Sequence, residues 1–113
     1  MVNNISVTEK DGTAIITCQG AIDSDTFRAF KDTLGNLIGS AKYKIVIVLT
    51  EISFMNSIGW GTIIGNLRNV RREKGDIVLA AMSENLKSTY FMTNFDEIIK
   101  AYNTVEEALE SFL

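Results

Sequence analysis

Histidine and proline are absent from this 113-residue sequence, and cysteine occurs once, at Cys18. Without histidine the chain lacks the most common general base and metal ligand, so most hydrolase and metalloenzyme mechanisms lose their usual parts. A single cysteine excludes an internal disulfide framework, and its apolar surroundings predict a small buried hydrophobe rather than a redox group. Because no proline-rich linker divides the chain, we expect one domain over residues 1–113.

An excess of positive charge is also missing. The chain has 11 basic and 14 acidic residues and a net charge of −3, so a direct nucleic-acid interface is not expected. There is no N-terminal apolar run of signal-peptide length and no 18-residue apolar stretch, which predicts a cytoplasmic protein without a membrane span. The hydrophobic content of 46% is enough to build one core.

The periodicity of apolar residues alternates between strand and helix along the chain. Asp11-Gly12 joins two alternating runs and predicts a hairpin, and later β-branched apolar runs are typical of buried parallel strands. This order predicts an α/β fold, in which a mixed sheet of about five strands, an antiparallel hairpin followed by parallel strands, packs with about four helices. The expected strands are 5–10, 13–19, 44–49, 76–81 and 98–102. The expected helices are one that follows Asp23-Ser24 and is closed by Gly39-Ser40, then 57–72, 83–92 and one that begins after Thr104.

Polar residues mark two of the helix starts. Asp23 or Ser24 is expected to cap the first helix, while Thr104 and Glu107 match a capping box at the last one. The lone carboxylates of Asp25 and similar residues fit solvated or capping positions.

Motifs of catalytic chemistry are missing. The sequence has no dinucleotide-binding or phosphate-binding glycine loop and no serine nucleophile elbow. Thr50 and Glu51 follow the first buried strand, where a receiver domain would carry a phosphoacceptor aspartate. We therefore expect a protein that is not an enzyme and that has no metal site and no cofactor.

The helix expected over 57–72 begins at Asn56-Ser57. The first turn of a helix has unpaired backbone N–H groups and the positive end of the helix dipole. Either residue could act as a simple cap. Alternatively, a phosphate on Ser57 would be stabilised by the same groups.

Ile58 is an unusual residue directly after these polar positions. On a helical wheel it lies about 160° from Trp60, the centre of the predicted buried stripe. It should therefore face away from the core, beside Thr62 and Gly65, unless the first turn tilts it inward. Gly61 and Gly65 would leave this surface flat enough for another backbone to approach closely.

The segment EISFMNSIGWGTIIG, residues 51–65, resembles the signature of the anti-sigma factor antagonists of the STAS domain family, approximately D-[LV]-S-x-[MIL]-D-S-[ST]-G-L-G. QGAIDSDT, residues 19–26, resembles the G-x-[IL]-D stretch of that family, and FMTNFDEIIKAYNTVEEAL, residues 91–109, resembles its C-terminal pattern. The resemblance covers nearly the whole chain. The signature residues that match or nearly match are Glu51, Ser53, Met55, Asn56, Ser57, Gly59 and Gly61.

The resemblance implies a binding switch in bacterial transcription regulation. Members of the family bind an anti-sigma factor that is also a serine kinase and thereby release a sigma factor. The kinase phosphorylates a hydroxyl in the signature, a phosphatase resets it, and docking uses the helix N-terminus with the neighbouring loop. The residues expected to contact the partner are Asp23, Ser24, Asn56, Ser57, Ile58, Gly59, Gly61, Thr62 and Gly65.

Two residues depart from the signature. Ile58 stands where the family usually has its phosphoacceptor, and Asn56 replaces the preceding acid. Ser57 is then the remaining acceptor candidate. The alternatives are a STAS interaction module that works without phosphorylation, and a small-ligand or nucleotide sensor. In each case we expect a monomer or weak dimer.

Overall fold

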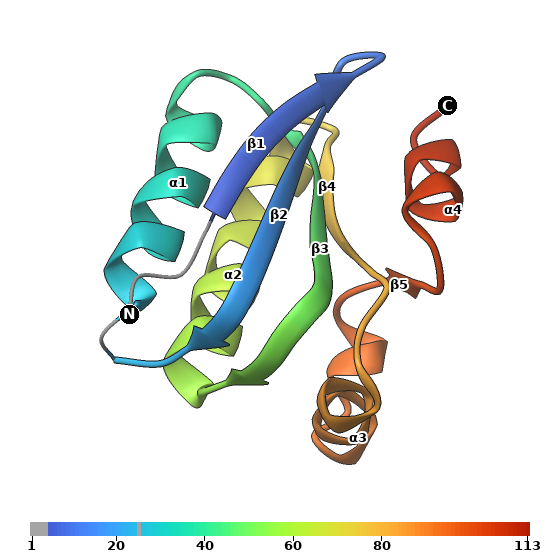
Figure 1. Cartoon of the computed structure of the whole chain (residues 1–113). Helices are drawn as coiled ribbons and strands as arrows, with labels where there is room; N and C mark the ends of the chain where they lie inside the picture. The colour runs from blue at the N-terminus through green and yellow to red at the C-terminus, as the bar shows by residue number, and fades with distance from the viewer. Residues whose placement is uncertain (1–4, 25) are drawn as a thin grey trace.

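The computed structural model describes residues 5–24 and 26–113. Its five strands form one sheet in the order β1-β2-β3-β4-β5, and β1 is antiparallel to β2 while every later pair is parallel (Figure 1). The predicted mixed sheet is therefore confirmed. In chain order the elements are β1 (Ile5–Lys10), β2 (Thr13–Ile22), α1 (Phe27–Gly39), β3 (Lys44–Met55), α2 (Ser57–Arg72), β4 (Asp76–Ala80), α3 (Glu84–Met92), the 3-10 helix η1 (Phe95–Glu97), β5 (Ala101–Tyr102) and α4 (Val105–Glu110).

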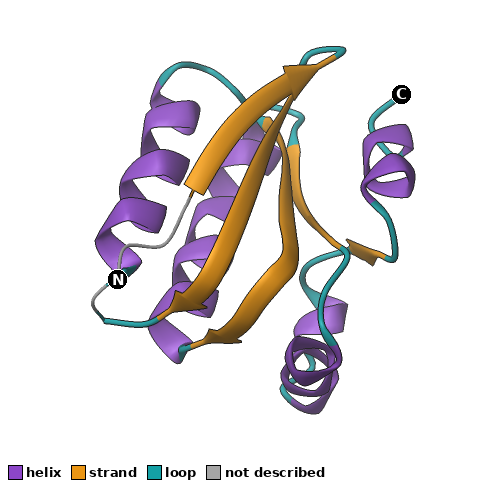
Figure 2. Cartoon of the chain, viewed as in Figure 1, coloured by secondary structure: helices purple, strands orange, loops and turns teal. Residues whose placement is uncertain are grey.

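Helices lie on both sides of the sheet (Figure 2). The larger core lies between the sheet and helices α1 and α2, and includes Ile47 of β3 and Phe30 of α1. A smaller cluster, which includes Val46 and Val48 of β3, packs against Ala108 of α4 on the opposite face. Because successive strand residues point to opposite faces, β3 needs apolar residues at both its odd and its even positions. This explains the continuous apolar run in its first half.

The Asp11-Gly12 hairpin forms as predicted. Both residues have positive φ, 52° and 83°, which is the combination that a two-residue type I′ turn requires. The turn sets the register, with Lys10 opposite Thr13 and Ile5 opposite Cys18.

Strand β3 is longer than the expected range 44–49. It continues to Met55 because its second half pairs with β2, as far as Ile22 opposite Met55. Its pairing with β4 ends earlier, at Val48 opposite Ala80. The second half is exposed at most of its positions, and this mixed composition hid the strand from a pattern based on continuous hydrophobicity.

Strand β5 is shorter than the expected range 98–102, because only Ala101–Tyr102 pairs with β4. The preceding residues form η1 and a bend. The Arg71 guanidinium donates a hydrogen bond to the Ile98 carbonyl at 2.8 Å and also pairs with Asp76 at 2.9 Å. The Ile98 carbonyl is thus bonded to a side chain instead of a neighbouring strand.

The ends of the helices agree in part with the sequence. At α4, the Thr104 hydroxyl accepts from the Glu107 N–H at 3.1 Å and the Glu107 carboxylate accepts from the Thr104 N–H at 3.2 Å, which confirms the capping box. Helix α1 ends at Gly39 as expected. Across residues 5–24 and 26–113, none of the helices has the length and apolar character to cross a membrane.

Candidate functional site

The candidate site lies where β2 and β3 end and α2 begins, at the lower end of the sheet in Figure 1. Two register shifts, between Thr17 and Gln19 and between Gly20 and Ala21, interrupt the pairing of these strands. Such irregularities bend a strand and increase its local twist. The ends of both strands extend beyond the last residue of β3 that pairs with β4, so this part of the sheet projects toward the start of α2.

Asn56 connects the end of the sheet to the helix. Its backbone N–H donates to the Ile22 carbonyl at 3.0 Å, and its side-chain oxygen accepts from the Gly59 N–H at 2.9 Å. Asn56 is therefore the N-cap, and Ser57 is the first helical residue. Of the two cap candidates in the sequence, the structure selects the asparagine and leaves the serine hydroxyl available.

Replacing Asn56 with alanine is expected to lower the free energy of unfolding by about 1 kcal/mol, because the Gly59 N–H loses its partner. Urea unfolding followed by circular dichroism measures this change. Asn69→Ala is the matched control, since Asn69 is exposed on the same helix and alanine has the higher helix propensity. Equal losses for the two variants would contradict the capping role.

Ser57 and Ile58 are both exposed in the first turn of α2. Within the described residues the Ser57 hydroxyl makes no hydrogen bond, and it lies at the positive end of a 16-residue helix. The Ile58 side chain is 50% exposed, while Trp60 and Ile63 are buried. The outward orientation predicted from the helical wheel is confirmed.

The three glycines of this segment differ in their surroundings. Gly59 is buried, and a Cβ there would lie 2.6 Å from Met55 Cγ and 3.1 Å from Ile22 Cγ2. Gly59 was expected to contact the partner, and the structure corrects this expectation. The buried Gly59 allows α2 to pack closely against the strand ends and does not offer a surface. Gly61 and Gly65 are exposed with open space around them, and so they leave the outer face of α2 flat.

Thr62 is half-buried on the same face of α2. Its hydroxyl donates to the Ile58 carbonyl at 2.9 Å, a common way for threonine to satisfy its hydroxyl within a helix. The hydroxyl is therefore engaged within the helix. This leaves the surface next to Ile58 weakly polar.

The corner between β2 and α1 differs from its prediction. Neither Asp23 nor Ser24 caps α1, because the helix begins only at Phe27 with Thr26 as its N-cap. The Asp23 carboxylate accepts from the Thr26 N–H at 3.2 Å, and the Thr26 hydroxyl donates to the Ala21 carbonyl at 2.6 Å. The Asp23 side chain thus stabilises a turn, whereas Ser24 is exposed next to it. Asp25 lies outside the described residues.

Phe54 is an exposed aromatic residue that the sequence reasoning missed. Its side chain is 52% exposed at the end of β3, opposite Ala21 of β2. Together, Phe54 and Ile58 place two large apolar side chains on either side of the Asn56 cap. The alternation of strand residues could have indicated this exposure. Ile52 and Met55 are the inward residues of this strand end, and Phe54 directly precedes Met55, so its side chain points to the other side.

Cys18 and Trp60 are core residues, as predicted. Burial raises the pKa of the Cys18 thiol to about 12, so the reactive thiolate is scarce at neutral pH. The Trp60 ring packs against Phe95, with centroids 5.1 Å apart, and against Tyr90 at 6.5 Å. These contacts attach η1 and α3 to α2, behind the exposed face.

Comparisons with known proteins cover most of the chain. Residues 4–108 match the family model described as STAS domain. An anti-sigma-B factor antagonist of Listeria monocytogenes is 32% identical over 107 residues, which are 92% of this chain and 92% of the relative. A Thermotoga neapolitana protein is 34% identical over 67 residues, so that match spans only 59% of each chain.

Solved structures share the fold at lower identity. A crystal structure of an anti-sigma factor antagonist from Mycobacterium paratuberculosis has a TM-score of 0.88 and 22% identity, covering 96% of this chain and 92% of that one. The phosphorylated form of the Bacillus cell fate determinant SpoIIAA has a TM-score of 0.74 and 19% identity, covering 97% and 100%. At these identities the likeness concerns the fold alone.

Proposed function

Because this chain belongs to the STAS domain family, we propose that it acts as an anti-sigma factor antagonist, which binds an anti-sigma factor in the bacterial cytoplasm and so frees a sigma factor. It works by binding rather than by catalysis. The observation that carries the proposal is the exposed pair Phe54 and Ile58 at the capped start of α2, inside the segment that the family signature covers.

The docking surface comprises Phe54, Ser57, Ile58, Gly61 and Gly65. Large apolar side chains that are buried at the centre of an interface supply most of its binding energy. Phe54 and Ile58 provide such side chains, and the open faces of the two glycines allow a partner helix or loop to approach the α2 backbone. Ser24 and Thr62 lie on the neighbouring β2–α1 corner and on α2, and we assign them to the rim.

We propose Ser57 as the phosphoacceptor, since its hydroxyl is exposed and not hydrogen-bonded within the described part of the chain. A phosphate there would add roughly two negative charges beside the N-terminal amides of α2, which stabilise an anion without moving the backbone. The same charge would lie next to Ile58, in the apolar part of the contact, where it must lose its water on docking. Phosphorylation should therefore release the partner, and a phosphatase would restore binding.

Incubation with the cognate anti-sigma factor kinase and ATP is expected to add one phosphate to the wild-type protein, detected by intact mass and assigned to Ser57 by peptide mapping. Ser57→Ala should remain unmodified. Ile58→Ser, which puts a hydroxyl in the usual position of the signature, is the positive control for kinase activity. Modification of Ile58→Ser but not of the wild type would contradict Ser57 as the acceptor and would favour a docking surface that is always active.

Binding itself is tested by titrating the unphosphorylated protein into the purified anti-sigma factor in a calorimeter, and then repeating the titration with Phe54→Ala. Saturable binding that is weakened at least tenfold by the variant is the expected result. If no binding occurs while nucleotides or small anions raise the melting temperature, the small-ligand sensor would be the better assignment.

A further inference from the structure

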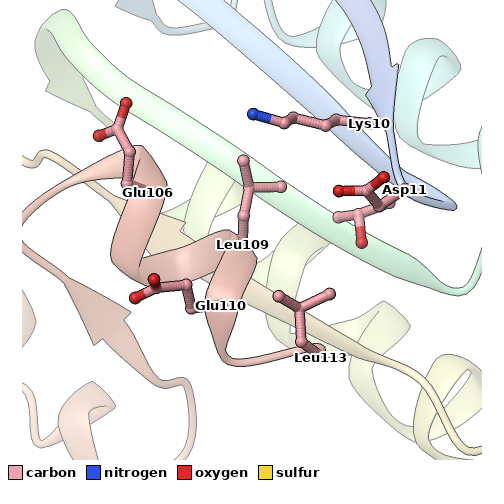
Figure 3. Close-up of a pocket in the computed structure, with 7 residues that line it drawn as sticks. Lys10, Asp11, Glu106, Leu109, Glu110 and Leu113 are labelled. Atoms are coloured by element: carbon pink, nitrogen blue, oxygen red, sulfur yellow. The ribbon is translucent and has the colours of Figure 1, made fainter.

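A second site is indicated on the sheet face opposite α1 and α2, between the β1–β2 hairpin and α4. A cavity of about 180 Å³ is lined there by Lys10, Asp11 and Thr13 from the hairpin, and by residues of α4 and the chain that follows it. This volume has room for about six water molecules. In Figure 3, Leu109 and Leu113 point toward the hairpin, where Lys10 and Asp11 border the opening.

Thr13 is the feature that distinguishes this cavity from an ordinary surface hollow. The residue is only 3% exposed and is the one buried polar residue of the described chain, yet its hydroxyl has no hydrogen-bond partner among residues 5–24 and 26–113. It shares the strand face of Ile15, which packs against the α4-side cluster, so its side chain points toward the cavity. The hydroxyl oxygen is not among the fully buried, unpaired polar atoms of the described chain, so it is reached through the cavity and is free to pair with a bound polar group.

The charges around the cavity are also unpaired. Three carboxylates, of Asp11, Glu106 and Glu110, and one ammonium, of Lys10, line it. None of the four forms an ion pair with another described residue. The excess of negative charge favours a cation, while Leu109 and Leu113 offer apolar surface to a short hydrocarbon stem.

We propose that this cavity binds a small organic cation, namely a primary ammonium on a short branched alkyl chain. The ammonium lies among the carboxylates and donates a hydrogen bond to the Thr13 hydroxyl, and the alkyl chain contacts Leu109 and Leu113. The exposed carboxylates are screened by solvent, so the affinity is modest, of the order of 1 mM. The inference does not depend on the proposed function, because the cavity and the docking surface lie on different elements of the fold.

The probe for the test is 3-methylbutylammonium, titrated into the ¹⁵N-labelled full chain at constant ionic strength and followed by amide chemical shifts. Saturable shifts are expected at residues 10–13 and 106–113. The matched probes 3-methylbutanol and 3-methylbutanoate share the branched five-carbon skeleton but carry no positive charge, and they should bind at least about fivefold more weakly. Equal shifts with the alcohol, or shifts that never saturate, would overturn the proposal.

Charge variants give effects of opposite sign. Glu110→Gln should weaken binding of the ammonium about two- to fivefold, whereas Lys10→Gln should strengthen it by a similar factor, because a like charge is removed. Glu73→Gln, an exposed acid outside the cavity, should leave the affinity unchanged. Weaker binding in Lys10→Gln would contradict a cationic ligand.

Thr13→Val tests the unpaired hydroxyl. The variant should bind the ammonium less tightly, and without ligand its melting temperature should equal or exceed that of the wild type, since the hydroxyl forms no hydrogen bond there. A large fall in melting temperature would show that the hydroxyl is already satisfied within the fold, and would remove the basis of the proposal. Unchanged affinity would likewise contradict it.

Discussion

Gly75→Ala is expected to lower the free energy of unfolding by about 3 kcal/mol, a large share of the roughly 5–15 kcal/mol that stabilises a typical domain. A Cβ at this position would overlap the Tyr43 carbonyl oxygen and would lie 2.6 Å from the carbonyl carbon. Both atoms belong to the backbone, and the same oxygen accepts the Asp76 N–H at 2.9 Å at the start of β4. The clash can be relieved only by separating the start of β4 from the start of β3, which breaks this hydrogen bond.

Thermal unfolding followed by circular dichroism measures the effect, and a fall of about 10 °C or more is expected. Gly35→Ala is the matched control. Gly35 is exposed within α1 and has open space around a Cβ, so alanine should raise the stability by up to about 1 kcal/mol. If the two variants melted at the same temperature, the close approach of Gly75 to Tyr43 would be wrong.

The strands that the sequence predicted well are those whose burial matches their pattern. The run Ile45–Leu49 is buried on both faces and the Asp11-Gly12 turn has a specific backbone requirement, so both could be identified locally. The end of β3 and the two-residue β5 depend on contacts between distant segments. The first follows β2 beyond the edge of β4, and the second comes after a bend in which the Ile98 carbonyl accepts from the distant Arg71. No local pattern contains that information.

In the candidate site, too, some features follow from the local sequence pattern and others depend on contacts between distant segments. The helical period was enough to place Ile58 outside and Trp60 inside, because that argument needs only the axis of one helix. The burial of Gly59 depends on where Met55 and Ile22 lie, and the exposure of Phe54 depends on the extension of β3. The sequence therefore predicted the segment, while the structure was needed to separate its surface residues from its packing residues.

Ile58→Asp is expected to weaken binding of the anti-sigma factor by about 100-fold or more, because docking would bury a carboxylate in place of an apolar side chain. The fold should be unaffected. The side chain is half exposed, and a negative charge in the first turn of a helix interacts favourably with the helix dipole by about 0.3–1 kcal/mol. Calorimetric titration gives the affinity, and thermal unfolding of the same sample gives the stability.

Val7→Asp is the matched control for this variant, since Val7 is a β-branched residue of similar exposure, 42%, on β1 and outside the docking surface. It carries the same change in charge, so a general electrostatic effect on binding would appear in both variants. A loss of affinity confined to Ile58→Asp would locate the contact at the start of α2. A large loss of stability in Ile58→Asp would instead show that Ile58 contributes to the core, and unchanged affinity with intact stability would exclude it from the interface.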